Sequence, residues 1–293
     1  MVTKTMFEIE RKKEFFVGID SDGCTFDTME LKHKECFIPN TIKYYGLQAI
    51  SKYAREAAEF VNLYSKSRGI NRFPALTETL QWLQKRPEVK SRGFEITIPS
   101  SLETWINEES KLGNPALQKL LETSDDPDLQ LALAWSLKVN ETVAEMVSNV
   151  PPFPLVRESL EKLYTQADML VCSATPNEAL KAEWSEHGID KYVVEICGQE
   201  SGSKKETLAN ASKYEAHKSL MIGDAPGDFK AAVANHCLFY PINPGEEDAS
   251  WERFHEESID RFFEGTFAGE YQQMLLDEFD KYLPDLPPWP IDA

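Results

Sequence analysis

Two short segments carry pairs of carboxylates at spacings that suit chemistry on a charged substrate. Asp20 and Asp22 follow one short apolar run, and Asp224 and Asp228 follow another. One carboxylate of such a pair can attack as a nucleophile, while a second holds the proton that a leaving group needs. Four converging acids would repel one another, so their oxygens indicate a site for a cation such as Mg²⁺. Taken alone, each pair is also compatible with a surface loop or a helix cap.

Two further positions could bind an anion. Ser173 follows a third apolar run, and with Ala174 and Thr175 it offers a hydroxyl and backbone N–H groups ahead of a predicted helix. Thr175 could equally be the N-cap of that helix. Lys204 begins a later predicted helix and could neutralise a phosphate oxygen, although the neighbouring Lys205 could take this role instead.

The elements that would position these residues alternate between short apolar runs and amphipathic helices. The apolar runs are each followed by small, polar or turn-forming residues and occupy 15–19, 169–172, 192–196, 220–222 and 236–240. Helical patterns follow three of them, over 177–187, 204–216 and 229–235. Short, mainly apolar runs of this length are typical of buried parallel strands, so the pattern predicts an α/β fold with a Rossmann-like parallel sheet.

The stretch 28–150 has a different, mainly helical pattern. Helices are predicted over 43–67, 75–86, 100–111, 115–122 and 128–148, with one candidate strand at 94–98. Asp126 or a neighbour is expected to cap the last of these helices. Three prolines within 151–154 then exclude a continuing helix. We therefore expect a helical domain, 28–150, inserted into a core made of 1–27 and 151–245.

The acidic C-terminal region, 246–293, carries aromatic residues at helical spacing. Gly265 and Gly269 divide it into two predicted helices. Such an aromatic stripe is usually the buried face of an amphipathic helix, so we expect this extension to pack on the core. The alternative is a dimer surface, and the sequence leaves both a monomer and a homodimer open.

Composition narrows the class of protein. The 31 Lys and Arg against 49 Asp and Glu give a formal net charge of −18, which disfavours nucleic acids and anionic membranes as partners. No apolar run approaches the ~18 residues that a membrane helix needs, and the polar start lacks the apolar region of a signal peptide. The five cysteines contain no CxxC pair, so we expect free thiols and a cytoplasmic location.

Taken in order, these motifs resemble those of the haloacid dehalogenase-like superfamily. The first family motif is an apolar strand followed by DxDGT and a further Asp, and this sequence has Asp20-Ser21-Asp22-Gly23-Cys24-Thr25-Phe26-Asp27. Ser173 matches the second motif, Lys204 the third, and Gly223-Asp224 through Asp228 the fourth, GDxxxD. The resemblance covers about the first 27 residues and 150–245. Cys24 departs from the usual Thr or Val, and the region after 246 has no counterpart.

The resemblance implies a Mg²⁺-dependent phosphatase that acts on a small phosphorylated metabolite. Asp20 would be the nucleophile that forms an aspartyl-phosphate, and Asp22 would serve as general acid and then as general base. Ser173 and Lys204 would bind the phosphoryl oxygens. A true dehalogenase is disfavoured, because that reaction in this superfamily lacks the acid that Asp22 provides.

The resemblance also assigns the ligands of the cation and of the substrate. The implied metal ligands are Asp20, the backbone carbonyl of Asp22, Asp224 and Asp228. The backbone N–H groups of Gly23 and Cys24 would help to bind the phosphoryl oxygens. Ala174 and Thr175 are the other implied substrate-binding residues of the core.

The inserted region, 28–150, has the position of a C1-type cap, which in this family closes over the site and contacts the substrate. Arg68 and Arg72 are the best candidates for that contact, since forked guanidinium groups suit carboxylate or phosphate. They could instead be a basic helix end that complements the helix dipole. The alternative functions are a phosphomutase, a phosphonate hydrolase in which Lys66 forms a Schiff base, and a non-enzymatic binding protein of the same fold.

Overall fold

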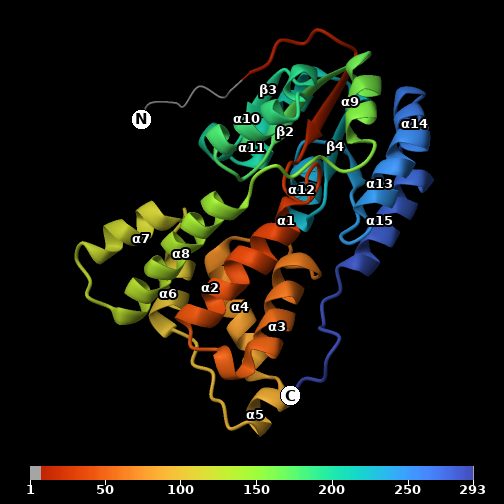
Figure 1. Ribbon diagram of the computed structural model, residues 1–293. Helices are drawn as coiled ribbons and strands as arrows, with labels where there is room; N and C mark the ends of the chain where they lie inside the picture. Colours follow the sequence, from red (N-terminus) through yellow and green to blue (C-terminus); the bar gives the residue numbers. More distant parts are fainter. Residues whose placement is uncertain (1–7, 293) are drawn as a thin grey trace. The chain divides into compact units, whose positions relative to one another are not determined.

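The computed structural model describes residues 8–292 and divides into two compact units (Figure 1). One unit is built around a parallel sheet and comprises 8–29 and 148–283, and the other is helical and comprises 30–147 and 284–292. The chain therefore begins in the sheet unit, forms the helical unit, returns to the sheet unit and ends on the helical unit.

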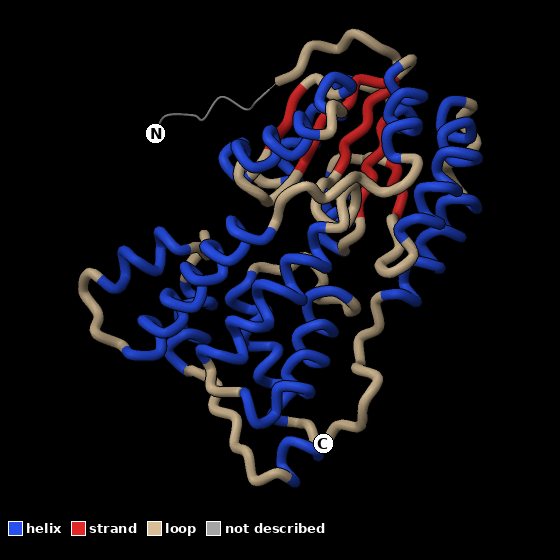
Figure 2. The backbone as a smooth tube through the Cα atoms, viewed as in Figure 1, coloured by secondary structure: helices blue, strands red, loops and turns tan. Residues whose placement is uncertain are grey.

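The sheet has five parallel strands in the order β3-β2-β1-β4-β5, drawn in red in Figure 2. They are β1 (Phe15–Ile19), β2 (Ala167–Cys172), β3 (Glu195–Cys197), β4 (Ser219–Gly223) and β5 (Leu238–Pro241). The chain passes from β1 outward to β3 and then resumes at β4 on the other side of β1. Ligands bind at the carboxyl ends of strands beside such a switch point. The predicted α/β fold with a parallel sheet is confirmed.

Helices cover both faces of this sheet, and short 3-10 or π helices are labelled η. In chain order they are α9 (Val156–Tyr164), α10 (Asn177–Glu186), η3 (Asp190–Tyr192), η4 (Gln199–Ser201), α11 (Lys204–Leu208), η5 (Ala209–Lys213), η6 (Ala216–Lys218), α12 (Pro226–Ala234), α13 (Glu247–Arg253), η7 (Phe254–Ser258), α14 (Ile259–Phe263) and α15 (Glu270–Tyr282).

The side chains of β1 alternate between two apolar layers. Val17 and Ile19 pack with residues of α9, α10, α13 and α14 on one face. Phe16 packs with residues of α11, α12 and the end of α15 on the other. Gly18 allows this close packing, because a Cβ there would lie 2.5 Å from Leu208 Cδ2. Burial on both faces explains why the strands are mainly apolar, with Asp168 in β2, Glu195 in β3 and Ser219 in β4 as exceptions.

The helical unit encloses a core of its own, which includes Phe73, Leu102 and Trp135. Its elements, with α1 leading into it, are α1 (Thr28–Leu31), η1 (Lys32–Phe37), α2 (Ile38–Tyr44), η2 (Gln48–Ile50), α3 (Ser51–Leu63), α4 (Arg72–Gln84), α5 (Pro87–Ser91), α6 (Ser100–Glu108), α7 (Asn114–Leu121) and α8 (Pro127–Met146). Asp126 caps α8 as predicted, because its Oδ1 accepts from the N–H groups of Asp128 and Leu129, each at 3.0 Å. None of the described helices is both long and apolar enough to cross a membrane.

Two predictions of secondary structure in this region are wrong. The helix predicted over 43–67 is divided, because α2 ends at Tyr44 and Gly46, with a φ of +66°, turns the chain before α3. The predicted strand at 94–98 has no regular structure. Phe94, Ile96 and Ile98 alternate because they pack on the core of the helical unit, and not because the segment pairs with a strand.

The C-terminal region contacts both units in turn. Residues of α13, α14 and α15 belong to the apolar layers of the sheet unit. Beyond Leu283 the segment contains four prolines, which exclude a helix. Here the Trp289 ring packs against Phe60 of α3, with ring centroids 5.5 Å apart, and the Arg86 guanidinium lies 4.5 Å from the Trp289 centroid. The prediction that 246–293 packs on the core is therefore wrong for 284–292.

We expect Trp289→Ala to destabilise the helical unit by about 2 kcal/mol, because an aromatic and a cation–π contact are lost together. Amide hydrogen exchange measured by mass spectrometry should become faster in α3, while β1 and β4 keep their protection. Leu286→Ala, in the same segment but at a side chain that is 63% exposed, is the matched control. Equal exchange in α3 of both variants would contradict this prediction.

Candidate active site

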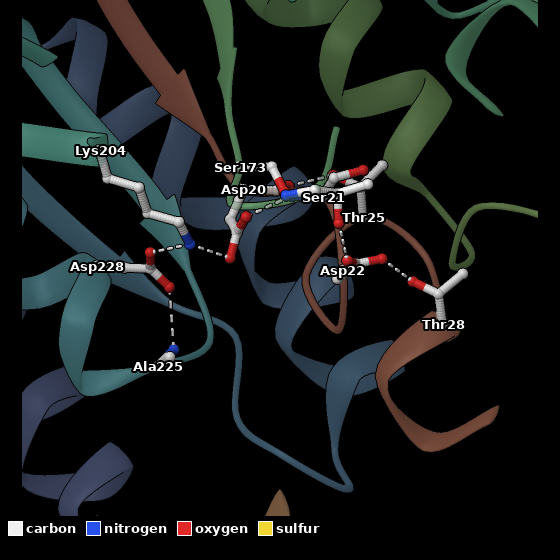
Figure 3. A network of polar contacts seen from close by, with 10 residues as sticks. Asp20, Ser21, Asp22, Thr25, Thr28, Ser173, Lys204, Ala225 and Asp228 are labelled. Carbon is white, nitrogen blue, oxygen red and sulfur yellow. Dashed lines mark hydrogen bonds and ion pairs between the residues drawn. The ribbon is translucent and has the colours of Figure 1, made fainter. Parts of the chain in front are cut away.

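Side chains at the carboxyl ends of three neighbouring strands meet at one edge of the sheet. Asp20 follows β1, Ser173 follows β2 and Asp224 follows β4. Pairing continues past the strand ends, since the N–H of Asp20 donates to the carbonyl of Ile222 at 3.0 Å. Figure 3 shows Asp20 and Ser173 side by side, with Lys204 reaching toward Asp20. The register of the strands thus brings together residues about 150 to 200 positions apart.

Three buried carboxylates converge at this edge. Among the described residues, Asp20, Asp224 and Asp228 offer oxygen atoms that all lie within 4.8 Å of one another. Each of the three residues is at most 5% exposed. Carboxylate oxygens are the ligands that Mg²⁺ and Ca²⁺ prefer, so this group has the chemistry of a site for a hard divalent cation.

Lys204 supplies one positive charge to this group. Its Nζ lies 2.6 Å from Asp20 Oδ2 and 2.5 Å from Asp228 Oδ1, whereas Lys205 is exposed. Burial raises the pKa of Asp20 well above its ordinary value against the opposing effect of Lys204, and Asp228 and Asp224 raise it further. Burial alone would lower the pKa of Lys204, but the Asp20 and Asp228 carboxylates raise it well above the ordinary value. One ammonium does not balance the charge of three ionised carboxylates, so a further cation would stabilise the group.

The geometry of Asp228 depends on a glycine at the end of β4. The Asp228 side chain folds back from the first turn of α12, and its Oδ2 accepts from the N–H of Ala225 at 3.1 Å. A Cβ at Gly223 would lie 2.5 Å from the Cβ of Asp228. Any other residue at position 223 would therefore displace the carboxylate that contacts Lys204.

The Asp22 carboxylate lies apart from these three acids. The hydroxyl of Thr28 donates to its Oδ1, and the hydroxyl of Thr175 donates to its Oδ2 at 2.6 Å. In Figure 3 the Asp20 carboxylate points toward Lys204, whereas that of Asp22 points toward Thr28. The family resemblance implies that the backbone carbonyl of Asp22 is a metal ligand, and this role stays a prediction.

The segment after β2 is held by its own hydroxyl groups. Ser173 is buried, and its Oγ accepts from the N–H of Thr175 at 3.2 Å. The helix that follows, α10, has Pro176 at its N-cap with no side-chain cap. The alternative in which Thr175 caps that helix is therefore wrong, because its hydroxyl is directed to Asp22. Contacts of Ala174 and Thr175 with a substrate stay a prediction.

The backbone N–H groups of Gly23 and Cys24 are used within their own loop. That of Gly23 donates to the carbonyl of Phe26 at 2.8 Å, and that of Cys24 to the carbonyl of Ser21 at 3.4 Å. Burial raises the pKa of the Cys24 thiol well above its usual range, and the carboxylates of Asp224 and Asp20 raise it further. The thiol therefore stays protonated, as suits a packing role rather than a nucleophile.

The sequence was compared with models of protein families. Residues 97–240 match the model described as haloacid dehalogenase-like hydrolase. Over these residues the chain is similar to the haloacid dehalogenase-like hydrolases. The matched segment includes Ser173, Lys204, Asp224 and Asp228, and the fold adds Asp20 to them through the central place of β1 in the sheet. No curated protein matches the sequence at a significant level.

Several solved structures resemble the chain at low sequence identity. Two are crystal structures of proteins provisionally described as phosphoglycolate phosphatases, each with 14% identity and a TM-score of 0.48. The protein from Haemophilus somnus is matched over 80% of this chain and 88% of its own, and that from Lactobacillus delbrueckii over 88% and 100%. A haloacid dehalogenase-like hydrolase from Streptococcus pneumoniae has 12% identity and a TM-score of 0.42, covering 83% of this chain and 92% of its own. These values carry no information about the substrate.

The two arginines predicted to contact the substrate form hydrogen bonds within the helical unit. Arg68 is 2% exposed, and its Nη1 donates to the carbonyl of Leu63 at 2.8 Å. Nη1 of Arg72 donates to Asn140 Oδ1 at 2.6 Å and to Ser136 Oγ at 3.0 Å. Burial lowers the pKa of Arg72 to about 10. These contacts give both arginines a structural role, and contact with a substrate stays a prediction.

Three side chains that support the site were missed by the sequence analysis. Thr28 donates to Asp22, and the indoles of Trp184 and Trp251 donate to the loop that carries Asp20. Thr28 lies eight residues after Asp20, near enough for a turn to bring it back. The two tryptophans left no signal, because each contact spans more than 160 residues.

We expect Lys204→Met to destabilise the sheet unit by about 3 kcal/mol in the absence of divalent cations, because it leaves buried carboxylates without their counter-charge. Urea unfolding followed by tryptophan fluorescence would measure this loss. Lys205→Met is the matched control, since that neighbouring side chain is exposed. A loss below about 1 kcal/mol in Lys204→Met, or an equal loss in the control, would show that the ion pairs are not needed for folding.

Proposed function

We propose that the chain is a Mg²⁺-dependent phosphatase that hydrolyses a small phosphomonoester through an aspartyl-phosphate. The observation that carries the proposal is the convergence of Asp20, Asp224 and Asp228 at the carboxyl edge of the sheet, where Lys204 pairs with Asp20 and Asp228. The match of residues 97–240 to the haloacid dehalogenase-like hydrolases supports it.

The buried acids fit a divalent cation by their chemistry. The three carboxylates lie close together, the Lys204 ammonium pairs with two of them, and all three residues are buried. Asp20, Asp224 and Asp228 would hold the ion, whose charge would reduce the repulsion between an attacking carboxylate and a phosphoryl group. With a cation bound, the pKa of Asp20 would fall and its carboxylate would be ionised and nucleophilic.

The residues of the chain would then divide the reaction into two steps. An oxygen of Asp20 attacks phosphorus, the bond from phosphorus to the leaving oxygen breaks, and Asp22 gives that oxygen its proton. In the second step Asp22 takes a proton from water, the water oxygen attacks phosphorus, and the Asp20 carboxylate leaves with its electron pair. Ser173 and Lys204 would donate hydrogen bonds to the phosphoryl oxygens in both steps.

Asp22 suits the proton-transfer role because its place is set independently of the acid cluster. Its two oxygens accept from the hydroxyls of Thr28 and Thr175. A group that moves protons must be held near the leaving oxygen without joining the ligands of the cation. We propose in addition that the helical unit, which is inserted between β1 and β2, acts as a cap that selects the substrate.

We expect the protein to release phosphate from at least one member of a panel of small phosphomonoesters, and only when Mg²⁺ is present. Asp20→Asn should lower kcat by at least about 10³-fold, because the amide cannot act as the nucleophile. Asp190→Asn, at an exposed acid outside the site, should keep full activity. Substantial turnover by folded Asp20→Asn would remove Asp20 from the nucleophile role, and transfer of phosphate within one substrate would indicate a phosphomutase.

Mg²⁺ alone should stabilise the protein if the three acids bind it. At 100 times its dissociation constant, a ligand that binds only the folded state adds about 2.7 kcal/mol. The melting temperature of the wild type should therefore rise by several degrees with MgCl₂, and that of Asp224→Asn by much less. Sodium chloride at equal ionic strength is the control. An equal rise in both proteins would place the ion elsewhere.

A further inference from the structure

The loop that carries the proposed nucleophile, residues 20–28, is shaped largely by its own hydrogen bonds, and we call it the Asp20 loop. The N–H groups of Thr25 and Phe26 donate to the carbonyl of Ser21 at 2.8 and 3.1 Å. The hydroxyl of Thr25 donates to the carbonyl of Asp20 at 2.7 Å. These bonds fold the loop locally, but they do not fix its place against the rest of the sheet unit.

One carbonyl of the Asp20 loop accepts a hydrogen bond from the C-terminal part of the chain. The indole Nε1 of Trp251, in α13, donates to the carbonyl of Cys24 at 2.7 Å across 227 residues. Cys24 and Trp251 are both 0% exposed. Water therefore cannot replace the donor, and a Cys24 carbonyl deprived of it would have to move or stay unsatisfied.

Trp251 is itself held firmly to the sheet. The hydroxyl of Tyr240, in β5, donates to the carbonyl of Ser250 at 2.5 Å, and the N–H of Asn243 donates to Ser250 Oγ at 3.0 Å. The Phe254 ring packs edge-on against the indole, with centroids 5.5 Å apart. The hydrogen bond from the indole therefore fixes the Asp20 loop relative to β5 and α13.

A second indole contacts the same loop from another element. Nε1 of Trp184, in α10, donates to Ser21 Oγ at 3.0 Å, and that hydroxyl donates to Glu183 Oε2 at 3.2 Å. The loop is therefore held at Ser21 by a helix that follows β2 and at Cys24 by a helix that follows β5. Two fixed points on either side of Asp22 leave the loop little freedom to shift.

We propose that Trp251 is a positioning residue for catalysis, which sets the place of Asp20 and Asp22 through the Cys24 carbonyl. The C-terminal extension is thereby part of the catalytic apparatus and not only a cover for the sheet. The proposal rests on the proposed phosphatase function for its kinetic consequence, while its structural consequence can be measured without turnover.

The kinetic test uses p-nitrophenyl phosphate with Mg²⁺ as the probe. Trp251→Phe removes the N–H donor and keeps an aromatic ring, so we expect kcat to fall about tenfold while KM stays within about twofold. Phe267→Leu is the matched control, because this ring is 0% exposed in the same extension and packs on Tyr240 and Tyr271. We expect the control to lose stability to a similar extent and to keep its kcat.

A second variant separates the hydrogen bond from packing. Trp251→3-benzothienylalanine has the shape of tryptophan with sulfur in place of N–H, so it should fold where Trp251→Phe does not. Its kcat should fall as in Trp251→Phe. A kcat within about twofold of wild type in this folded variant would overturn the proposal.

Hydrogen exchange provides a readout that does not need activity. In both Trp251 variants the amides of 21–26 should exchange at least about tenfold faster than in wild type, and those in Phe267→Leu should not. If the wild type releases no phosphate, the proposed function fails and exchange alone decides whether Trp251 positions the loop. Equal exchange of 21–26 in Trp251 variants and in Phe267→Leu would overturn the proposal.

Discussion

Repulsion among buried carboxylates is the constraint on which this structure depends. Asp20, Asp224 and Asp228 lie within 4.8 Å of one another, and none is more than 5% exposed. Such a group is unfavourable unless positive charge accompanies it, because desolvation and mutual repulsion both penalise the ionised forms. Lys204 supplies one charge through two ion pairs. The remaining negative charge makes this group suitable for binding a divalent cation.

The rest of the sheet unit holds these charges in place. Parallel pairing of β1 with β2 and β4 brings three strand ends to one edge. Gly223 leaves space for Asp228 to fold back toward Lys204. Indoles from α10 and α13 fix the loop that carries Asp20. Fixed dipoles and charges of this kind are what stabilise charge that develops during a phosphoryl transfer.

The chain passes between the two units once more than a simple insertion requires. After the sheet unit is completed at Leu283, the last described residues return to the helical unit, where Trp289 packs on Phe60 and Arg86. Lys90 and Asp292 add an ion pair at 2.8 Å. Helices α13–α15 thus pack in the core of the sheet unit, and the final described residues pack on the core of the helical unit.

The sequence by itself determined the parallel sheet, the approximate position of every strand in it, and the order of the acids and Lys204 along the chain. It could do so because buried strands are short and mainly apolar, and because functional residues follow them directly. It failed where alternation arose from packing on helices, as at 94–98, and where helical periodicity continued across a turn at Gly46. The tertiary structure alone decided which lysine faces the acids, that Asp22 is held by Thr28 and Thr175, and that Trp251 supports the Asp20 loop. Contacts between residues far apart in the chain leave no spacing pattern, so only the folded arrangement reveals them.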